Sequence, residues 1–153
     1  MNEQINEGDL TIRAIERSDI EQLAQLEKEC FSDPWSEQML SETLENPICV
    51  NLAIKKGEQI IAFAFAYHIM TEMQIMQFAV APLHRRKGLA DKMLEKMVEY
   101  AGDNEVESFY LEVRKSNKAA QKLYAKHNFK QTAVRKRYYD SPAEDAVIME
   151  LVL

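Results

Sequence analysis

Apolar and polar residues alternate over residues 9–15 (DLTIRAI), and this period of two predicts a half-buried strand. From Ser18 onward the apolar spacing changes to three and four residues, which predicts a helix. Ser18 and Glu21 are expected to form the capping box of this helix. Its predicted apolar face consists of Ile20, Leu23, Leu26 and Cys30.

A second helix is predicted after the segment FSDPWS, which interrupts the helical spacing. Ser36 is of a residue type preferred at helix N-caps. Trp35, directly before it, can pack on Leu40 as a hydrophobic staple. Asn46-Pro47 is expected to end this helix, because the residue before a proline is driven out of the helical region.

Three β-rich runs come next. Residues 48–54 and 59–67 flank the turn KKGE, which predicts a hairpin. The third run covers residues 73–81 and stops at Pro82. A long amphipathic helix is then predicted through Tyr100. Its apolar face consists of Leu89, Met93, Leu94, Met97 and Val98.

The last third of the chain predicts a strand, a helix and two further strands. Residues 108–113 form a buried strand pattern, and Ser116 or Asn117 can cap the helix that follows. Asn128 is expected to end that helix. One face of it combines Ala120, Leu123, Tyr124 and His127.

The two final strands are predicted over residues 129–134 and 146–151, with a polar connection around Tyr138 to Glu144. The complete order is therefore β-α-α-β-β-β-α-β-α-β-β. This order predicts a single α/β (α+β) domain over residues 1–153, with a mixed central sheet and helices on both faces.

Composition places the chain among ordinary globular proteins. Its 153 residues are 46% hydrophobic and 29% charged, which excludes a disordered, collagen-like or coiled-coil chain. The longest apolar run, residues 60–67, is too short to span a bilayer. Cys30 and Cys49 match no metal-site spacing and are expected to be free thiols. The start MNEQINEGD lacks the features of a signal peptide, so a cytoplasmic location is expected.

Charge changes the picture of possible partners. The chain has 19 basic and 25 acidic residues, a net charge of −6, which argues against a protein whose task is to bind nucleic acid. An acidic protein is compatible with a basic partner. A solvated acidic surface explains the same balance without any partner.

The turn RRKGLA is the first segment with chemical content. A predicted strand ends there and a helix begins, so the first helical N–H groups lack partners and the positive end of the dipole faces outward. Gly88 permits close approach of a ligand to the backbone, and Ala90 keeps that approach open. The turn is a candidate phosphate or diphosphate cradle, although a solvated basic turn has the same pattern. Its positive side chains are Arg85, Arg86 and Lys87.

The string YLEVRKSNKAAQKLYAKHNF, with the strand, loop and helix before it, resembles the GNAT superfamily of acetyl-CoA-dependent N-acetyltransferases. The resemblance covers nearly the whole chain. The segments FSDPWSE, LEVRKSN, RKRYY and EDAVIM are further similar to the bacterial RimI-type enzymes of this superfamily. Where the family usually has a glycine before the motif phenylalanine, this chain has Asn128, which also tolerates a left-handed helix end.

Acetyl transfer to an amine requires a base for the amine and a proton for the leaving thiolate. A free α-amine has a pKa near ~8 and is largely protonated at neutral pH. Glu112, in an otherwise apolar strand, is the predicted base, directly or through one water. A structural carboxylate paired with Arg114 or a nearby lysine is the alternative for Glu112. The resemblance assigns Tyr124 as general acid, where the residue pattern alone suggests a core tyrosine.

The resemblance also implies how acetyl-CoA is bound. In GNAT folds the strand that matches Phe78-Ala79-Val80 splays from its neighbour, and its free backbone groups bind the pantetheine arm. A free N–H there would polarise the thioester carbonyl. Asn117 would contact the pantetheine or phosphate region, with a simple N-cap as its alternative. The other expected cofactor-binding residues are Arg85, Arg86, Lys87, Gly88, Leu89, Ala90 and Asp91.

The resemblance implies that the acceptor is the N-terminal alanine of a protein, the eighteenth small-subunit ribosomal protein. Trp35, Tyr138 and Tyr139 are expected to wall the slot for its first residues, although Trp35 can equally be a staple. Glu72 and Asp145 are weaker candidates for contact with a basic substrate. The net charge of −6 suits such a ribosomal partner.

Three functions stay open on these patterns. The favoured one is an N-terminal protein acetyltransferase that uses acetyl-CoA and no metal. The same fold can instead acetylate a small amine or a lysine side chain. A non-catalytic acyl-CoA-binding module is the third, which the presence of both Glu112 and Tyr124 disfavours. The patterns do not address the oligomeric state.

Overall fold

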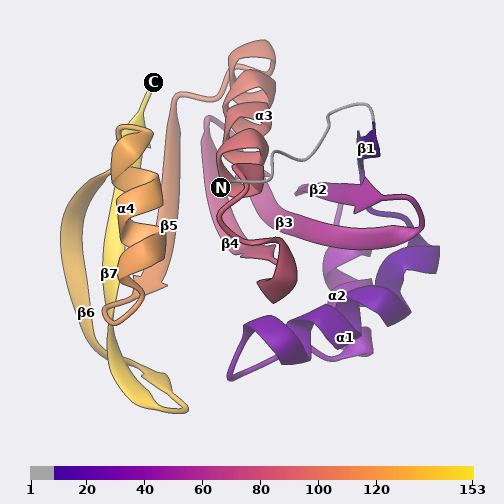
Figure 1. The fold of residues 1–153 in the computed structure, drawn as a ribbon. Coiled ribbons are helices and arrows are strands. Elements are labelled where there is room, and N and C mark those ends of the chain that lie inside the picture. Colours follow the sequence, from indigo (N-terminus) through magenta and orange to yellow (C-terminus); the bar gives the residue numbers. More distant parts are fainter. Residues whose placement is uncertain (1–8) are drawn as a thin grey trace.

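A seven-stranded mixed sheet forms the centre of the molecule in the computed structural model (Figure 1). The strands lie side by side in the order β1-β2-β3-β4-β5-β7-β6. Only β4 and β5 run parallel, and each of the other neighbouring pairs is antiparallel. The strands are β1 (Leu10–Arg13), β2 (Cys49–Lys56), β3 (Gln59–Ile69), β4 (Glu72–Val80), β5 (Ser108–Arg114), β6 (Lys130–Asp140) and β7 (Ala143–Val152).

Helices cover both faces of this sheet, as predicted (Figure 1). Two short 3₁₀ turns precede α1 and follow β4. The predicted element order is confirmed for the part of the chain that the structure describes, residues 9–153. The helices are α1 (Ile20–Cys30), α2 (Glu37–Glu45), α3 (Leu89–Asp103) and α4 (Lys118–Lys126), and the 3₁₀ turns are η2 (Arg17–Asp19) and η3 (Pro82–His84).

Each face of the sheet has its own hydrophobic core. One core joins α3 and α4 to the sheet, through residues such as Met93, Leu94 and Phe109. The other joins α1 and α2 to the opposite face, through Leu23 and Leu40. These residues are fully buried, and at about 25 cal/mol per Å² of apolar surface such burial is the main source of stability.

Two local predictions about the helix caps have different outcomes. Ser36 is the N-cap of α2, and its hydroxyl accepts a hydrogen bond from Met39 N–H at 3.2 Å, as predicted. The predicted capping box of Ser18 and Glu21 is wrong. The capping box lies two residues earlier, in η2, where Glu16 N–H donates to the Asp19 side chain at 2.8 Å.

The predicted polar connection between the last two strands is also wrong. Strands β6 and β7 continue through this segment and form a long hairpin that turns at Ser141-Pro142, with Tyr139 opposite Glu144 (Figure 1). Periodicity misses this extension because β6 is an edge strand whose residues are almost all exposed, so it carries no apolar alternation.

Residues 1–8, which include most of the segment used to predict the absence of a signal peptide, lie outside the described residues. None of the helices in residues 9–153 is long and apolar enough to cross a membrane.

A buried ion pair anchors the start of α1 to strand β1. Both terminal nitrogens of the Arg13 guanidinium donate to the Asp19 carboxylate, at 2.7 and 3.0 Å. Asp19 is only 5% exposed. The Arg13 hydrogen bonds hold the pKa of Asp19 below its ordinary value of 3.8, although burial acts in the opposite direction.

We expect Asp19→Asn to lower the free energy of unfolding by about 2 kcal/mol at pH 7, because it removes charge-assisted hydrogen bonds. A lowered native pKa stabilises the protein above the unfolded-state pKa, and that contribution disappears as the pH falls through the native pKa. The difference between wild type and Asp19→Asn should therefore shrink in acid, measured by urea unfolding from pH 7 to pH 3. The exposed Asp103→Asn is the control, and an equal loss there would contradict the assignment.

Candidate active site

The parallel strands β4 and β5 separate halfway along their length, and this divergence creates the candidate site. They pair only from Glu72 opposite Ser108 to Ile75 opposite Leu111. Directly afterwards β4 has an extra residue, Met76, because Ile75 faces Ala66 of β3 while Gln77 faces Phe65. Such a bulge bends a strand and interrupts its ladder. Beyond it β4 stays with β3 and leaves β5, which is the splay that the resemblance implies.

The divergence leaves backbone groups of β4 without a strand partner on the β5 side. Ala81 N–H donates to Ile61 of β3 at 2.8 Å. Because backbone groups alternate along an antiparallel strand, Ala79 also points to β3, and Phe78 and Val80 point into the opening. Arg85 Nε accordingly reaches the Val80 carbonyl at 3.0 Å. Of the three residues expected to bind the cofactor, Phe78 and Val80 thus face the opening, whereas the backbone groups of Ala79 point to Phe63 of β3.

The turn between β4 and α3 has the geometry of an anion cradle. Gly88 is the N-cap of α3 with φ of 80°, in the left-handed region. The first α-helical bond runs from Lys92 N–H to the Gly88 carbonyl at 3.1 Å. The three N–H groups before it, of Leu89, Ala90 and Asp91, therefore have no partner within the helix. The Leu89 side chain lies in the core, so only its backbone can reach a ligand.

Two of the three cations in this turn are available to a ligand. Arg85 is held by the Val80 carbonyl. Arg86, with φ of 62°, and Lys87 have no ion pair among residues 9–153. Three unpartnered N–H groups beside two free cations are a donor set that suits a diphosphate.

The side chain of Asp91 makes contacts within the protein, while its N–H belongs to the cradle. Its Oδ1 accepts hydrogen bonds from His127 Nε2 at 2.8 Å and from Lys126 Nζ at 2.9 Å. Although burial acts in the opposite direction, these bonds lower the pKa of Asp91 from its ordinary value. These bonds tie the start of α3 to the end of α4. The Asp91 carboxylate itself would repel a phosphate, because the two charges have the same sign.

Asn117 and Asn128 mark the two ends of α4. Asn117 is the N-cap, and its Oδ1 accepts from Ala120 N–H at 3.1 Å, so the simple capping interpretation holds for this oxygen. Asn117 as a whole is exposed in the β5–α4 turn. Asn128 adopts φ of 72°, the left-handed conformation expected where the family usually has glycine.

Glu112 lies on β5 just past the last residue paired with β4. Its Oε1 accepts from the Tyr110 hydroxyl at 2.8 Å and lies 3.5 Å from Arg135. The pairing with Arg114 considered from the sequence is wrong, because Arg114 instead binds Glu144 at 3.2 Å. The carboxylate of Glu112 is thus oriented by a phenol and a guanidinium while 13% of its side chain stays exposed.

A second bulge, in β6, brings two tyrosines to Glu112. Arg135 faces Ala146 and Tyr139 faces Glu144, so β6 has two extra residues in between. The rings of Tyr138 and Tyr139 lie edge to face with centroids 5.0 Å apart, which consecutive residues of a regular strand cannot achieve. Hydrogen bonding to Glu112 raises the pKa of Tyr138. Burial, with the charge of Glu112, raises the pKa of Tyr139 to about 12.

Tyr124 approaches the opening from the other side of the sheet. It is buried on α4 and packs against Phe78 and Phe129, with ring centroids 5.9 and 5.4 Å away. Burial raises the pKa of the phenol well above its ordinary value of 10, so it carries its proton at neutral pH. Its hydroxyl makes no hydrogen bond within residues 9–153. Glu112 points to the face opposite the α4 core, to which its neighbours Leu111 and Val113 belong.

The loop between α1 and α2 borders the same opening on the Glu112 face. The Trp35 ring packs against Phe65 at 5.8 Å. The Ser32 hydroxyl donates to the Ser141 carbonyl at 2.9 Å, which joins this loop to the tip of the β6–β7 hairpin. Trp35 and the two tyrosines of the hairpin are therefore carried by two segments in direct contact.

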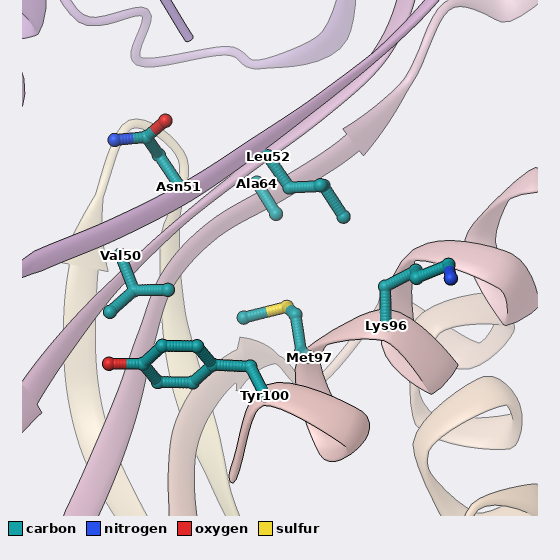
Figure 2. A pocket seen from close by; sticks show the side chains of 7 residues that line it. All are labelled: Val50, Asn51, Leu52, Ala64, Lys96, Met97 and Tyr100. Atoms are coloured by element: carbon teal, nitrogen blue, oxygen red, sulfur yellow. The ribbon is translucent and has the colours of Figure 1, made fainter. Parts of the chain in front are cut away.

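A cavity of about 140 Å³ lies elsewhere, between α3 and strands β2 and β3 (Figure 2). Lys96, Met97 and Tyr100 reach it from α3. No predicted site residue lines it, so it is separate from the opening between β4 and β5. Its other lining residues are Val50, Asn51, Leu52 and Ala64.

Two residues at this site are absent from the sequence predictions. Tyr110 stands two positions before Glu112 on the same strand, and period two places both on one face, so alternation could have identified it. Arg135 could not be found this way, because the register of β6 beside β7 brings it to Glu112. Weaker candidates do not gain support: Asp145 binds Arg137 N–H at 2.9 Å, and Glu72 is exposed at the start of β4.

Comparison with known proteins agrees with this geometry. A model of the acetyltransferase (GNAT) family matches residues 20–129. The [ribosomal protein bS18]-alanine N-acetyltransferase of Haemophilus ducreyi is 34% identical over 145 residues, which are 93% of this chain and 99% of the relative. The crystal structure of the ribosomal-protein-S18-alanine N-acetyltransferase from Escherichia coli superimposes with a TM-score of 0.87 at 30% identity and covers 94% of this chain and 93% of its own.

A more distant structure has the same fold. Arabidopsis thaliana NAA60 in complex with acetyl-CoA superimposes with a TM-score of 0.84 at 18% identity, over 94% of this chain and 98% of its own.

We expect Gly88→Val to weaken the binding of acetyl-CoA by about tenfold or more. No atom crowds a side chain at this position, so the effect comes from the left-handed φ, which costs a β-branched residue ~1–2 kcal/mol and shifts the start of α3. Isothermal calorimetry with acetyl-CoA measures the loss. Gly102→Val, at an exposed and uncrowded position near the end of the same helix, is the matched control and should bind normally. Normal binding by Gly88→Val would refute the cradle.

Proposed function

The chain belongs to the acetyltransferase (GNAT) family, and on that premise we propose that it acetylates the N-terminal alanine of ribosomal protein bS18. The observation that carries the proposal is the opening between β4 and β5, with a carboxylate on one sheet face and a protonated phenol on the other. The H. ducreyi relative, which this chain matches over nearly its whole length, has the activity in its name. A ribosomal-protein acceptor would place the reaction in the cytoplasm.

The donor is acetyl-CoA, which carries the acetyl group as a thioester. The acetyl group passes from the sulfur to the amine nitrogen. The N–H groups at the start of α3, with Arg86 and Lys87, would hold its diphosphate. The backbone of Phe78 and Val80 would hold the pantetheine arm along β4. A free N–H in this stretch can also donate to the thioester carbonyl oxygen and stabilise the charge that develops there.

Glu112 would accept the proton of the attacking amine. A carboxylate at the border of the opening can do so directly or through one water. Tyr110 and Arg135 orient it toward the site. Tyr124, which carries its proton throughout the neutral range, would return that proton to the leaving thiolate from the opposite face.

The acceptor would enter on the Glu112 face, between the α1–α2 loop and the β6–β7 hairpin. Trp35, Tyr138 and Tyr139 form the apolar border there. Residues 20–45, which make up α1, α2 and their loop, include one basic residue and seven acidic residues, of which only Glu27 is buried. A basic ribosomal protein suits this side of the molecule, because complementary charge raises the rate of encounter.

Mass spectrometry with two peptides tests the acceptor class. Purified protein is mixed with acetyl-CoA and a hexapeptide that begins with alanine, or with its N-terminally blocked twin that contains an internal lysine. We expect one acetyl group on the free α-amine only. Acetylation of the lysine would transfer the enzyme to side-chain chemistry. No transfer to either peptide, with acetyl-CoA bound, would favour a small amine or a non-catalytic role.

We expect Glu112→Gln to lower kcat by about 10²–10⁴-fold with little change in the affinity for acetyl-CoA, because the amide cannot take the proton. Turnover of the alanine peptide and calorimetry with acetyl-CoA measure the two quantities. Glu107→Gln, an exposed position shortly before β5, is the control and should be fully active. Unchanged turnover in Glu112→Gln would refute the base assignment.

We expect Tyr124→Phe to slow the chemical step by a similar factor, since the thiolate would leave without a proton. Single-turnover kinetics separates this step from product release. Folding should be retained, because the ring keeps its contacts and the lost hydroxyl has no hydrogen-bond partner among the described side chains. Tyr67→Phe, on β3, is the control. A normal single-turnover rate in Tyr124→Phe would exclude it as the acid.

A further inference from the structure

Glu27 of α1 is a carboxylic side chain that is completely buried. Its Oε1 accepts two hydrogen bonds of 2.8 Å, one from Gln77 Nε2 on β4 and one from Trp35 N–H in the α1–α2 loop. No guanidinium, ammonium or imidazolium group in residues 9–153 pairs with it. An isolated buried carboxylate with no cation is among the most unfavourable arrangements in a protein interior.

The hydrogen bonds of Glu27 and Gln77 leave two oxygens unaccounted for. Glu27 Oε2 and Gln77 Oε1 are both buried, and neither has a hydrogen-bond partner. Both atoms are acceptors, and they belong to two groups that already share one hydrogen bond. A carboxylic acid and a primary amide pair through two parallel bonds, with the acid O–H donating to the amide oxygen and the amide N–H donating to the acid. One proton on Glu27 Oε2 would therefore satisfy both oxygens.

We propose that Glu27 is a neutral carboxylic acid paired in both directions with Gln77, and that this pair positions the α1–α2 loop against strand β4. The proton resides on Oε2 and is donated to Gln77 Oε1. Oε1 stays free to accept from the Gln77 amide and from Trp35 N–H. All four polar atoms of the pair are then satisfied, which a carboxylate would not achieve.

The surroundings of Glu27 favour this neutral form. Burial raises the pKa of Glu27, and the two hydrogen bonds at Oε1 offset only part of this effect. The titratable neighbour is the thiol of Cys30, one turn further along α1, with Arg85 beyond it. The other polar or charged residues that are buried in residues 9–153 are Asp19, Thr43 and Gln77, and Asp19 is already paired with Arg13.

The positioning role follows from which segments meet at the pair, and this part rests on the proposed function. Trp35 borders the acceptor slot. Gln77 is the first residue of β4 after the Met76 bulge, next to Phe78, whose backbone faces the opening. After the bulge the odd-numbered residues of β4 point to the α1 side, as Ala79 does. The pair thus connects the loop that carries Trp35 directly to β4, the strand that would hold the thioester.

The protonation state can be tested without any acceptor. Infrared spectroscopy of the full chain at neutral pH should show the carbonyl band of a protonated carboxylic acid. This band should disappear in Glu27→Gln and persist in Glu29→Gln, an exposed glutamate two positions further along α1. Absence of the band from wild type, or its persistence in Glu27→Gln, would overturn the proposal.

The pH dependence of stability gives a second test with a definite sign. A raised native pKa means that the folded state holds the proton more tightly than the unfolded chain. This contribution is complete below the ordinary pKa of 4.5 and is lost as the pH rises through the native pKa. Wild type should therefore lose stability relative to Glu27→Gln as the pH rises. A constant difference from pH 5 to pH 9 would contradict a neutral Glu27.

Kinetics tests the positioning role separately. Glu27→Leu removes every hydrogen bond of the pair, and we expect KM for the alanine peptide to rise about tenfold or more, with a smaller change in KM for acetyl-CoA. Glu27→Gln preserves both directions of the pair and should restore the wild-type KM. An equal defect in Glu27→Gln and Glu27→Leu would overturn the positioning role. A positive infrared result with no turnover in wild type would instead count against the proposed acceptor.

Discussion

The end of the parallel pairing between β4 and β5 is the constraint on which the site depends. Two parallel strands that stayed paired would form a closed sheet, and no backbone donor would be available to a ligand. The extra residue Met76 bends β4 while its bonds to β3 continue, so the sheet opens without coming apart. The same bulge exchanges the faces of β4: Ile75 belongs to the α3 core, whereas Ala79 belongs to the α1 core.

The opening is useful only because separate parts of the chain are held around it. Asp91 joins α3 to α4, and the Ser32–Ser141 hydrogen bond joins the α1–α2 loop to the β6–β7 hairpin. Each connection links segments far apart in sequence, and each is local to one side of the sheet. The proposed acid and base therefore face each other across the sheet rather than along a shared surface, which suits direct transfer from a donor on one face to an acceptor on the other.

Periodicity was sufficient for most of the fold, because nearly every element has one apolar face, as α3 shows with Met93 and Met97. It was insufficient at β6, where an exposed edge strand has no such signal. The place of Gly88 at the start of α3 was also predictable, because it depends only on neighbouring residues in the sequence. The Arg135 contact with Glu112 and the Glu27–Gln77 pair depend on register and tertiary packing between distant segments, and no spacing along the chain encodes them.

Net charge illustrates the limit of a whole-chain quantity. The value of −6 hides a segment, residues 113–139, with nine basic and no acidic residues. Three of these cations serve internal contacts, Arg114 with Glu144, Lys126 with Asp91 and Arg135 with Glu112. Charges further apart than about 8 Å are largely screened at physiological ionic strength, so a partner senses the local sign and not the sum. The acidic surplus that would attract a basic acceptor belongs to α1, α2 and their loop, which border the slot that this acceptor would enter.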